Sequence, residues 1–305
     1  MDGILVAAKP AGPTSHDVVA LVRRLAATKR VGHGGTLDPF ASGVLPLFLG
    51  RATRLVEYHL GNSKGYRATV CFGASSPTDD LEGELTPVPG SAPTRESVES
   101  TLPAYIGPIR QRPPAYSAIK VAGRRAYALA RSGASVELAE REVTIHSIEL
   151  EDWDGSDPDR PIATIAVECS AGTYIRALAR DLGEAVGNGA YLGALVRTAS
   201  GPFHLADAVP IETIREQAAN GAGSLESLLL PMDAGLDDLV EVVASDEEAA
   251  AIARGQFVRF SAAIGEGGGP IRVRDRTNRL IAIASVRDGR LAPDKVLVDP
   301  DPMAG

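Results

Sequence analysis

The segment 31–54, VGHGGTLDPFASGVLPLFLGRATR, places one carboxylate in a setting that favours chemistry. Asp38 precedes Pro39, so its backbone is pushed toward an extended conformation and its side chain has a stiff mount. Glycines at positions 32, 34, 35 and 43 would let a polynucleotide backbone or base come close. An isolated Asp-Pro more often caps a turn, and a phosphate-binding glycine loop also needs a lysine and a serine or threonine at fixed spacing. The loop alone therefore leaves Asp38 as a candidate.

Four separated stretches strengthen that candidate, because they occur together and in one order. They are KPAGPTS (9–15), GGTLDPFASGVLPLFLGRATR (34–54), KGYRATVCFG (64–73) and SAGTYIRALARDLG (170–183). Together they resemble the TruB family of tRNA pseudouridine synthases, and the likeness covers essentially the whole chain. The segment PPAYSAIKVAGRRAYALAR (113–131) resembles the basic RNA-clasping insertion of that family, and the last sixty residues resemble its PUA-type RNA-binding barrel.

The resemblance implies an isomerase that converts the uridine at position 55 in the T-loop of tRNA to pseudouridine. The base must be flipped out of the folded loop, at a cost of about a few kcal/mol, before it is reattached through C5. Asp38 would be the nucleophile, with an adduct at ribose C1′ or at uracil C6, and both stay open. Arg176 of GTYIR would pair with Asp38 and lower the carboxylate pKa by ~1–3 units. Without that motif it would be taken for a surface helix arginine.

Two tyrosines and a leucine would form the pocket for the base. Tyr66 would stack on the flipped uracil, with its hydroxyl near the C5 proton, and such stacking contributes ~1–3 kcal/mol per base. On pattern alone, a core tyrosine with a satisfied hydroxyl fits equally well. Tyr174 and Leu195 correspond to residues that wall the pocket in the family, although plain core packing also explains Leu195.

Three basic residues complete the candidate set for substrate binding. His33 would insert into the T-loop and fill the space left by the flipped base, through shape and stacking. A lone histidine beside glycines is otherwise more often a turn residue. Lys9 and Lys64 suit phosphate contact or bracing of the active-site loop, and a solvated lysine is the alternative for each.

Two departures from the family pattern bear on these expectations. Gly34 stands where threonine is usual, so one hydroxyl is missing and we expect a more flexible loop. The stretch SPTDDLEG (76–83) replaces the usual TDT-D-G, which leaves the roles of Asp79 and Asp80 open.

The hydrophobic pattern predicts the elements that position these residues. It indicates a helix that begins at Thr14 or Ser15 and stops at Gly32, further helices at 53–60, 94–102 and 174–186, and strands at 44–49, 66–72, 145–152 and 162–168. The segment 73–94 is typical of a loop. The resemblance implies an α+β fold, the pseudouridine synthase fold, with a mixed, mainly antiparallel sheet and flanking helices.

We expect two domains. The catalytic domain would span 1–235 and include the insertion at about 111–142, and a PUA-like RNA-binding β-barrel would span 242–300. The composition changes between about 230 and 245. Three strand-like runs beyond it (271–274, 279–286 and 295–298) favour the barrel.

The net charge of −8 argues at face value against RNA as a partner. The charge is nevertheless distributed unevenly: residues 1–70 carry nine basic and four acidic side chains, and 111–131 carry five basic and none acidic. The acid is concentrated in 132–170 and 201–250. A basic RNA-binding face is therefore compatible with the sequence.

Several classes of protein are disfavoured. No apolar run approaches the ~20 residues of a membrane-spanning helix, and the N-terminus lacks a signal-peptide pattern. Cys71, Cys169 and five scattered histidines show no metal-ligand spacing. We expect a cytoplasmic monomer that binds the T-arm of tRNA and needs no metal or cofactor. An RNA-binding or tRNA-folding module with secondary catalysis, and a guide-RNA-dependent subunit of the same family, stay open as alternatives.

Overall fold

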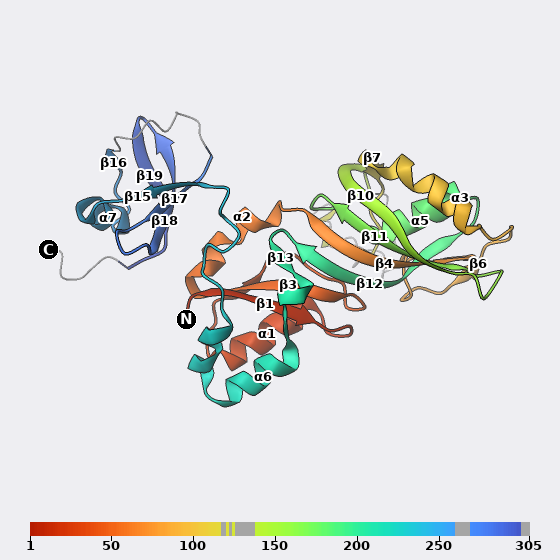
Figure 1. Cartoon of the computed structure of the whole chain (residues 1–305), viewed down its shortest axis with the longest axis horizontal. Helices are drawn as coiled ribbons and strands as arrows, with labels where there is room; N and C mark the ends of the chain where they lie inside the picture. The colour runs from red at the N-terminus through yellow and green to blue at the C-terminus, as the bar shows by residue number, and fades with distance from the viewer. Residues whose placement is uncertain (117–119, 122–123, 126–137, 260–268, 300–305) are drawn as a thin grey trace.

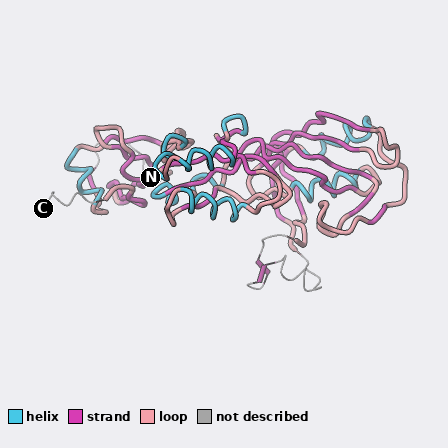
Figure 2. Tube along the Cα trace, turned by 90° about the horizontal axis from the view of Figure 1, so that it is seen from below, coloured by secondary structure: helices cyan, strands magenta, loops and turns pink. Residues whose placement is uncertain are grey.

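The computed structural model describes residues 1–116, 120–121, 124–125, 138–259 and 269–299. Its larger part is built on a ten-stranded mixed sheet, and its smaller part on a five-stranded sheet toward the C-terminus (Figure 1). Figure 2 shows an elongated molecule with the C-terminal part at one end. The predicted α+β fold with a mainly antiparallel sheet is confirmed.

The large sheet has the strand order β14-β1-β3-β12-β4-β11-β10-β7, with β2 paired to β3 and β13 paired to β12. Its strands are β1 (Gly3–Lys9), β2 (Val31–His33), β3 (Ser42–Leu49), β4 (Lys64–Phe72), β7 (Gly107–Gln111), β10 (Arg141–Asp154), β11 (Ile162–Cys169), β12 (Ala190–Ser200), β13 (Phe203–His204) and β14 (Val209–Pro210). The helices beside it are α1 (Ser15–Leu25), α2 (Glu57–Leu60), α3 (Arg95–Thr101), α5 (Ile175–Ala185) and α6 (Ile211–Ala219). Four 3₁₀ turns join them: η1 (Gly50–Leu55), η2 (Leu102–Tyr105), η3 (Leu205–Asp207) and η4 (Ala222–Leu228).

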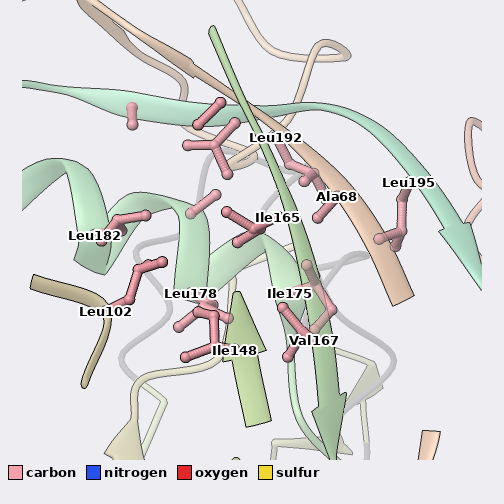
Figure 3. Packing of buried hydrophobic residues seen from close by; sticks show 14 of the residues in the cluster. Ala68, Leu102, Ile148, Ile165, Val167, Ile175, Leu178, Leu182, Leu192 and Leu195 are labelled. Carbon is pink, nitrogen blue, oxygen red and sulfur yellow. The ribbon is translucent and has the colours of Figure 1, made fainter. Parts of the chain in front are cut away.

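Two pairs of helices pack their apolar sides on the sheet, one pair toward each end of it (Figure 1). Helices α3 and α5 pack on β4, β10, β11 and β12, where Leu178 and Leu182 of α5 belong to the same cluster as Ile165 of β11 (Figure 3). Helices α1 and α6 pack on β1 and β3. Because each helix is apolar on one side only, this burial fixes which side faces the sheet.

The sheet is weakly joined between β3 and β12, where the pairing is parallel and limited to Val196 with Ser42 and Arg197 with Gly43. Gly43 has φ 111°, and a Cβ there would lie 2.2 Å from the Arg197 carbonyl oxygen. Only glycine allows this approach of the two backbones. The segment 34–41, between β2 and β3, leaves the sheet at this point and carries Asp38.

The small sheet has the order β15-β17-β18-β19-β16 and its own apolar core. It consists of β15 (Val240–Val243), β16 (Val258–Arg259), β17 (Ile271–Arg274), β18 (Leu280–Arg287) and β19 (Arg290–Val296), with α7 (Asp246–Ala253) beside it. A further apolar cluster joins it to the larger part through Leu55, Leu236, Leu280, Ile283 and Leu297.

Several element boundaries differ from the sequence prediction. The helix predicted at 53–60 is the 3₁₀ turn η1 followed by one turn of α2. The third barrel strand, predicted at 295–298, is β19 and begins at Arg290. The predicted loop 73–94 contains the short paired strands β5 (Ala74–Ser75) and β6 (Thr86–Pro87). Much of the insertion at about 111–142 lies outside the described residues, which include its short strands β8 (Lys120–Val121) and β9 (Arg124–Arg125).

Candidate active site

The backbone on either side of Asp38 is held by side chains from the N-terminal elements. Ser15 Oγ accepts a hydrogen bond from the Leu37 amide at 2.8 Å and donates to the Leu37 carbonyl at 3.1 Å. Lys9 Nζ donates to the carbonyls of Ala41 at 2.5 Å and Pro39 at 3.3 Å. These contacts fix the backbone before and after the aspartate, so the carboxylate has a defined position.

Lys9 and Lys64 both have a bracing geometry. The Lys9 side chain is buried in the interior of the protein, and its ammonium is surrounded by backbone carbonyls. Lys64 is also buried, and its Nζ donates to the Asn62 carbonyl at 2.9 Å. Burial lowers the pKa of each lysine to about 8. Of the two roles considered for them, bracing matches these contacts, because neither ammonium is free for a phosphate in this conformation.

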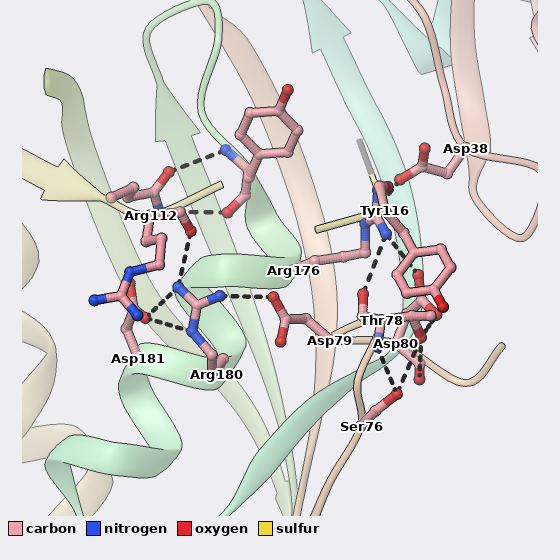
Figure 4. A network of polar contacts seen from close by, with 12 residues as sticks. Asp38, Ser76, Thr78, Asp79, Asp80, Arg112, Tyr116, Arg176, Arg180 and Asp181 are labelled. Atoms are coloured by element: carbon pink, nitrogen blue, oxygen red, sulfur yellow. Dashed lines mark hydrogen bonds and ion pairs between the residues drawn. The ribbon is translucent and has the colours of Figure 1, made fainter. Parts of the chain in front are cut away.

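Arg176 lies between two carboxylates at the beginning of α5 (Figure 4). Its Nε is 3.1 Å from Asp38 Oδ2, and its Nη1 is 3.0 Å from Asp80 Oδ2. The guanidinium also donates to the carbonyls of Thr78 and Tyr116, each at 3.1 Å. The arginine side chain is 8% exposed and Asp38 is 37% exposed. Arg176 therefore has a fixed orientation, while the carboxylate that it pairs with is partly buried and partly exposed.

The pKa of Asp38 is raised, because burial outweighs the stabilisation of its charge. Burial raises this pKa, Arg176 lowers it, the negative charge of Asp80 raises it, and Lys9 lowers it. The sequence led us to expect that Arg176 would lower the pKa. That contribution is present, but the net direction is the opposite.

The two aspartates that the sequence left without a role pair with two arginines one turn apart on α5. Asp80 binds Arg176, and Asp79 Oδ2 is 2.7 Å from Arg180 Nη1 (Figure 4). Thr78 Oγ1 also donates to Asp80 Oδ1 at 2.5 Å. Asp79 has φ 60°, a left-handed conformation that costs about 1 kcal/mol or more outside glycine. The strained turn thus delivers consecutive carboxylates to both arginines.

Tyr66 lies in β4, partly buried against the same apolar cluster as α5. In the strand register it stands opposite Arg197 of β12, so the two side chains lie on the same face of the sheet. Burial raises the pKa of Tyr66, and the Arg197 charge partly offsets that rise. Arg197 was not among the residues predicted from the sequence. An arginine inside the mainly apolar run of 190–199 is the signal that could have identified it.

The remaining candidates lie on neighbouring elements. Tyr174 is the N-cap of α5: its amide donates to the Gln111 side chain at 3.0 Å, and its ring lies under Arg141, 5.2 Å from ring centroid to guanidinium. Leu195 is 8% exposed and belongs to the core (Figure 3). This position matches core packing, which the sequence analysis gave as the alternative to a role in the base pocket.

His33 ends β2, next to the loop that carries Asp38. It is half-buried, its Nδ1 accepts a hydrogen bond from the Gly35 amide at 3.3 Å, and its ring meets that of His16 edge-on at 6.4 Å. Burial lowers the pKa of His33, and His16 and Arg197 lower it further. A Cβ at Gly34 would lie 3.0 Å from the Phe48 ring, so a larger residue there would need that ring to shift.

A hollow of about 350 Å³ lies beside β4, and Tyr66 is part of its lining. Its lining includes Gly65, Glu149, Glu168 and Thr198, and does not include Asp38 or Arg176. In the part of the chain that the structure describes, no three His, Cys, Asp or Glu side chains are grouped to hold a metal ion. None of the helices there is long and apolar enough to cross a membrane.

Comparison with known families covers nearly the whole chain. Residues 23–175 match the N-terminal domain of TruB family pseudouridylate synthases. Residues 176–237 match a C-terminal domain of tRNA pseudouridylate synthase B, and residues 241–297 match a C-terminal domain of pseudouridine synthase II TruB. The geometry and these matches together define an RNA-base isomerase. The chain belongs to the TruB family of pseudouridylate synthases.

Individual relatives agree with this assignment. The tRNA pseudouridine synthase B of Bradyrhizobium diazoefficiens is 44% identical, over 96% of this chain and 85% of its own. That of Symbiobacterium thermophilum is 48% identical, over 84% and 82%, and that of Geobacillus thermodenitrificans is 41% identical, over 97% and 99%.

Solved structures show the same fold at lower identity. A chain of a Cbf5-Nop10-Gar1 complex matches with a TM-score of 0.74 and 27% identity, over 98% of this chain and 86% of that one. A chain of an H/ACA RNP bound to a substrate RNA containing 2′-deoxyuridine matches with a TM-score of 0.72 and 25% identity, over 98% and 86%.

Proposed function

We propose that the protein isomerises uridine 55 in the T-loop of tRNA to pseudouridine, with Asp38 as the nucleophile. The observation that carries the proposal is the ion pair between Asp38 and Arg176, in which the arginine is buried and the carboxylate remains accessible. An accessible carboxylate whose orientation is fixed by a buried cation is suited to attack on a flipped base or its ribose. Relatives at 41–48% identity are named tRNA pseudouridine synthase B, which supports tRNA as the substrate.

The reaction requires bond exchange at one nucleotide without net change in composition. The C1′–N1 bond breaks, a C1′–C5 bond forms, C5 loses its proton and N1 gains one. Asp38 would hold either C1′ or C6 covalently while the base rotates. Arg176 would keep the carboxylate oriented, and Tyr66 would stack on the base with its hydroxyl near C5. Tyr174, Leu195 and His33 would shape the space around the flipped nucleotide.

The remaining parts of the proposal concern the molecule around this site. Residues 1–235 would form the catalytic domain, with the RNA-clasping insertion at about 111–142, and residues 242–300 a PUA-like RNA-binding domain. Arg276, Arg279 and Arg287 of the small part are exposed and each pairs with an aspartate, so phosphate contact there would replace these pairs. We propose that the protein acts in the cytoplasm as a monomer and without a cofactor.

The test is conversion of an unmodified T-arm hairpin by the purified chain, measured as release of tritium from C5 of the uridine. We expect stoichiometric release at position 55 and none from a hairpin with cytidine there. Asp38→Asn should abolish release, while tRNA binding stays within about tenfold, or ~1.4 kcal/mol. Full activity of Asp38→Asn would overturn the role of Asp38.

Tritium release and a tRNA-folding measurement together separate the two alternatives. A guide-dependent subunit would give little site-selective product alone, as the likeness to a chain of an H/ACA RNP would allow. If the protein is a tRNA-folding module, the Asp38→Asn variant should promote tRNA folding as well as the unmodified protein does, even though it releases no tritium. The relatives named tRNA pseudouridine synthase B are 41–48% identical to this chain, whereas the chains of those RNP structures are 25–27% identical, which favours the proposed activity.

A further inference from the structure

The largest fully buried side chain among the described residues is a cation, Arg197 of β12. It is 1% exposed, and no ion pair of the described residues includes it. Its guanidinium instead donates to three backbone carbonyls, those of Val44 at 2.8 Å, Gly35 at 3.2 Å and Thr36 at 3.3 Å. Burying a charge without a counter-ion is costly, so a role that needs the charge is expected.

Holding the loop does not by itself account for a buried charge. Ser15 and Lys9 already fix the backbone next to Asp38. Carbonyl oxygens also accept hydrogen bonds from neutral donors, which would cost far less to bury. The three carbonyls do, however, fix the plane and the position of the Arg197 guanidinium.

Tyr66 is the acidic group on which the Arg197 charge acts, and the basic groups Lys9, Lys64 and His33 also lie within range of that charge. Arg197 and Tyr66 are paired residues of adjacent antiparallel strands, so their side chains lie on one face of the sheet. The Arg197 charge favours the ionised form of that hydroxyl, against the effect of burial.

We propose that Arg197 is a positioning residue for the reaction: fixed by three loop carbonyls, it holds a positive charge on the face of the sheet that carries Tyr66, next to the oxygen that takes up the C5 proton. This inference rests on the proposed function. In the step concerned, the C5–H bond breaks, its electron pair returns to the uracil ring, and the proton passes to the Tyr66 oxygen. Arg197 does not touch the base, and it acts only through Tyr66.

The experiment is a double-mutant cycle on single-turnover tritium release, with saturating enzyme and a tRNA substrate. Arg197→Met removes the charge at similar length, Arg197→Lys keeps the charge but loses the planar fork, and Tyr66→Phe removes the oxygen. Each variant is measured from pH 6.5 to 9, together with its tRNA Kd and its melting temperature.

We expect Arg197→Met to lower the rate at pH 7 by about a hundredfold and Arg197→Lys by about tenfold, with Kd within about threefold. The loss in Arg197→Met should shrink as the pH rises, because alkali restores the phenolate. In the Tyr66→Phe background, Arg197→Met should lower the rate by less than about threefold. Should Arg197→Met fail to fold, the same cycle with Arg197→Lys decides.

Two results would overturn the inference. Equal losses in the Tyr66 and Tyr66→Phe backgrounds would mean that Arg197 braces the loop rather than acting through the tyrosine. A loss that does not vary with pH would exclude an effect on the phenolate. Absence of tritium release by the unmodified protein would instead contradict the proposed function itself, so the two failures are distinguishable.

Discussion

The chemistry of the site depends on one arginine that serves two carboxylates. Arg176 binds Asp38 through Nε and Asp80 through Nη1, so each aspartate influences the other through it and through their mutual repulsion. The Arg176 charge lowers the pKa of Asp38, whereas the Asp80 charge raises it. Removing the Arg176 charge should therefore raise the pKa of Asp38, and removing the Asp80 charge should lower it.

The acid limb of the pH–rate profile should report these shifts. The carboxylate is the reactive form in the proposed reaction, so the rate falls as the pH drops through the pKa of Asp38. Because this pKa is raised above 3.8, the limb should lie above that of an exposed aspartate. We expect Arg176→Gln to move the limb to higher pH and Asp80→Asn to lower pH, measured by single-turnover rates between pH 4 and 8. Shifts of the same sign in both variants would contradict the assignment.

Asp80 should also matter for the rate at neutral pH, and Asp79 provides a matched control. Asp80→Asn replaces a charged partner of Arg176 by a neutral one, which weakens the hold on the guanidinium. We expect a loss of about tenfold, or ~1.4 kcal/mol of barrier, with unchanged tRNA affinity. Asp79→Asn affects Arg180, which does not contact Asp38, so it should lower the melting temperature more than the rate. Equal rate losses in the two variants would show that only the turn as a whole is important.

At the scale of elements, the beginning of α1 combines two functions in adjacent residues. Thr14 is the N-cap: its hydroxyl accepts from the Asp17 amide at 3.0 Å, and the Asp17 carboxylate accepts from the Thr14 amide at 2.8 Å. Ser15 is buried and binds both backbone groups of Leu37. The helix terminus is thus tied directly to the loop of Asp38.

This difference predicts separable effects of two alanine substitutions. Thr14→Ala should cost ~1 kcal/mol of folding stability, as for other caps, and leave the rate nearly unchanged. Ser15→Ala should lower the single-turnover rate by about tenfold at similar stability loss, because the Leu37 amide loses its partner and Asp38 is less well fixed. Denaturant unfolding and tritium release on both variants measure this. A rate unaffected by Ser15→Ala would remove the loop-positioning role.

The sequence predicted the elements better than the contacts between them. Alternating residues of 66–72 and the helical pattern after Tyr174 were sufficient for β4 and α5, because local periodicity records which face is buried. Thr14 and Ser15 could not be separated as caps, since the burial of Ser15 comes from the distant residue Leu37.

The candidate site shows the same limit. The motifs brought Asp38 and Arg176 to attention, and the two are in contact. Asp80 and Arg197 were given no role, because their partners are distant in the sequence. Asp80 binds Arg176, 96 residues away, and Arg197 binds carbonyls that are 153 to 162 residues away. For Lys9 and Lys64 the sequence left phosphate contact, bracing and a solvated side chain open, and only the tertiary fold shows that both are buried.

At the scale of the whole molecule, the single turn α2 joins the two parts of the protein. Its consecutive residues reach different places: Glu57 lies 2.8 Å from Lys295 of the small sheet, Tyr58 packs on the apolar cluster between the two parts, and His59 points into the larger part. The exposed Glu57–Lys295 pair contributes little. The stability of this junction therefore depends mainly on its buried side chains.

His59 makes the junction sensitive to acid. Its ring is 3% exposed, packs between Phe48 at 5.0 Å and Phe203 at 5.6 Å, and neither ring nitrogen has a hydrogen-bond partner among the described residues. Burial, together with the nearby Lys64 charge, lowers the pKa of His59 from 6.5 to about 4. The unfolded chain therefore binds a proton between these two values more readily than the folded protein does.

The contribution of His59 to stability should be complete above pH 6.5 and should be lost as the pH falls toward 4. His59→Phe keeps a planar ring between the two phenylalanines and cannot take up a proton, so its free energy of unfolding should vary less over this range. Urea unfolding at pH 4.5, 5.5 and 7 measures the difference, with the exposed His204→Asn as the control. If His59→Phe and the unmodified protein lose stability in parallel, acid must act elsewhere, and the neutral buried ring is then not what limits the junction.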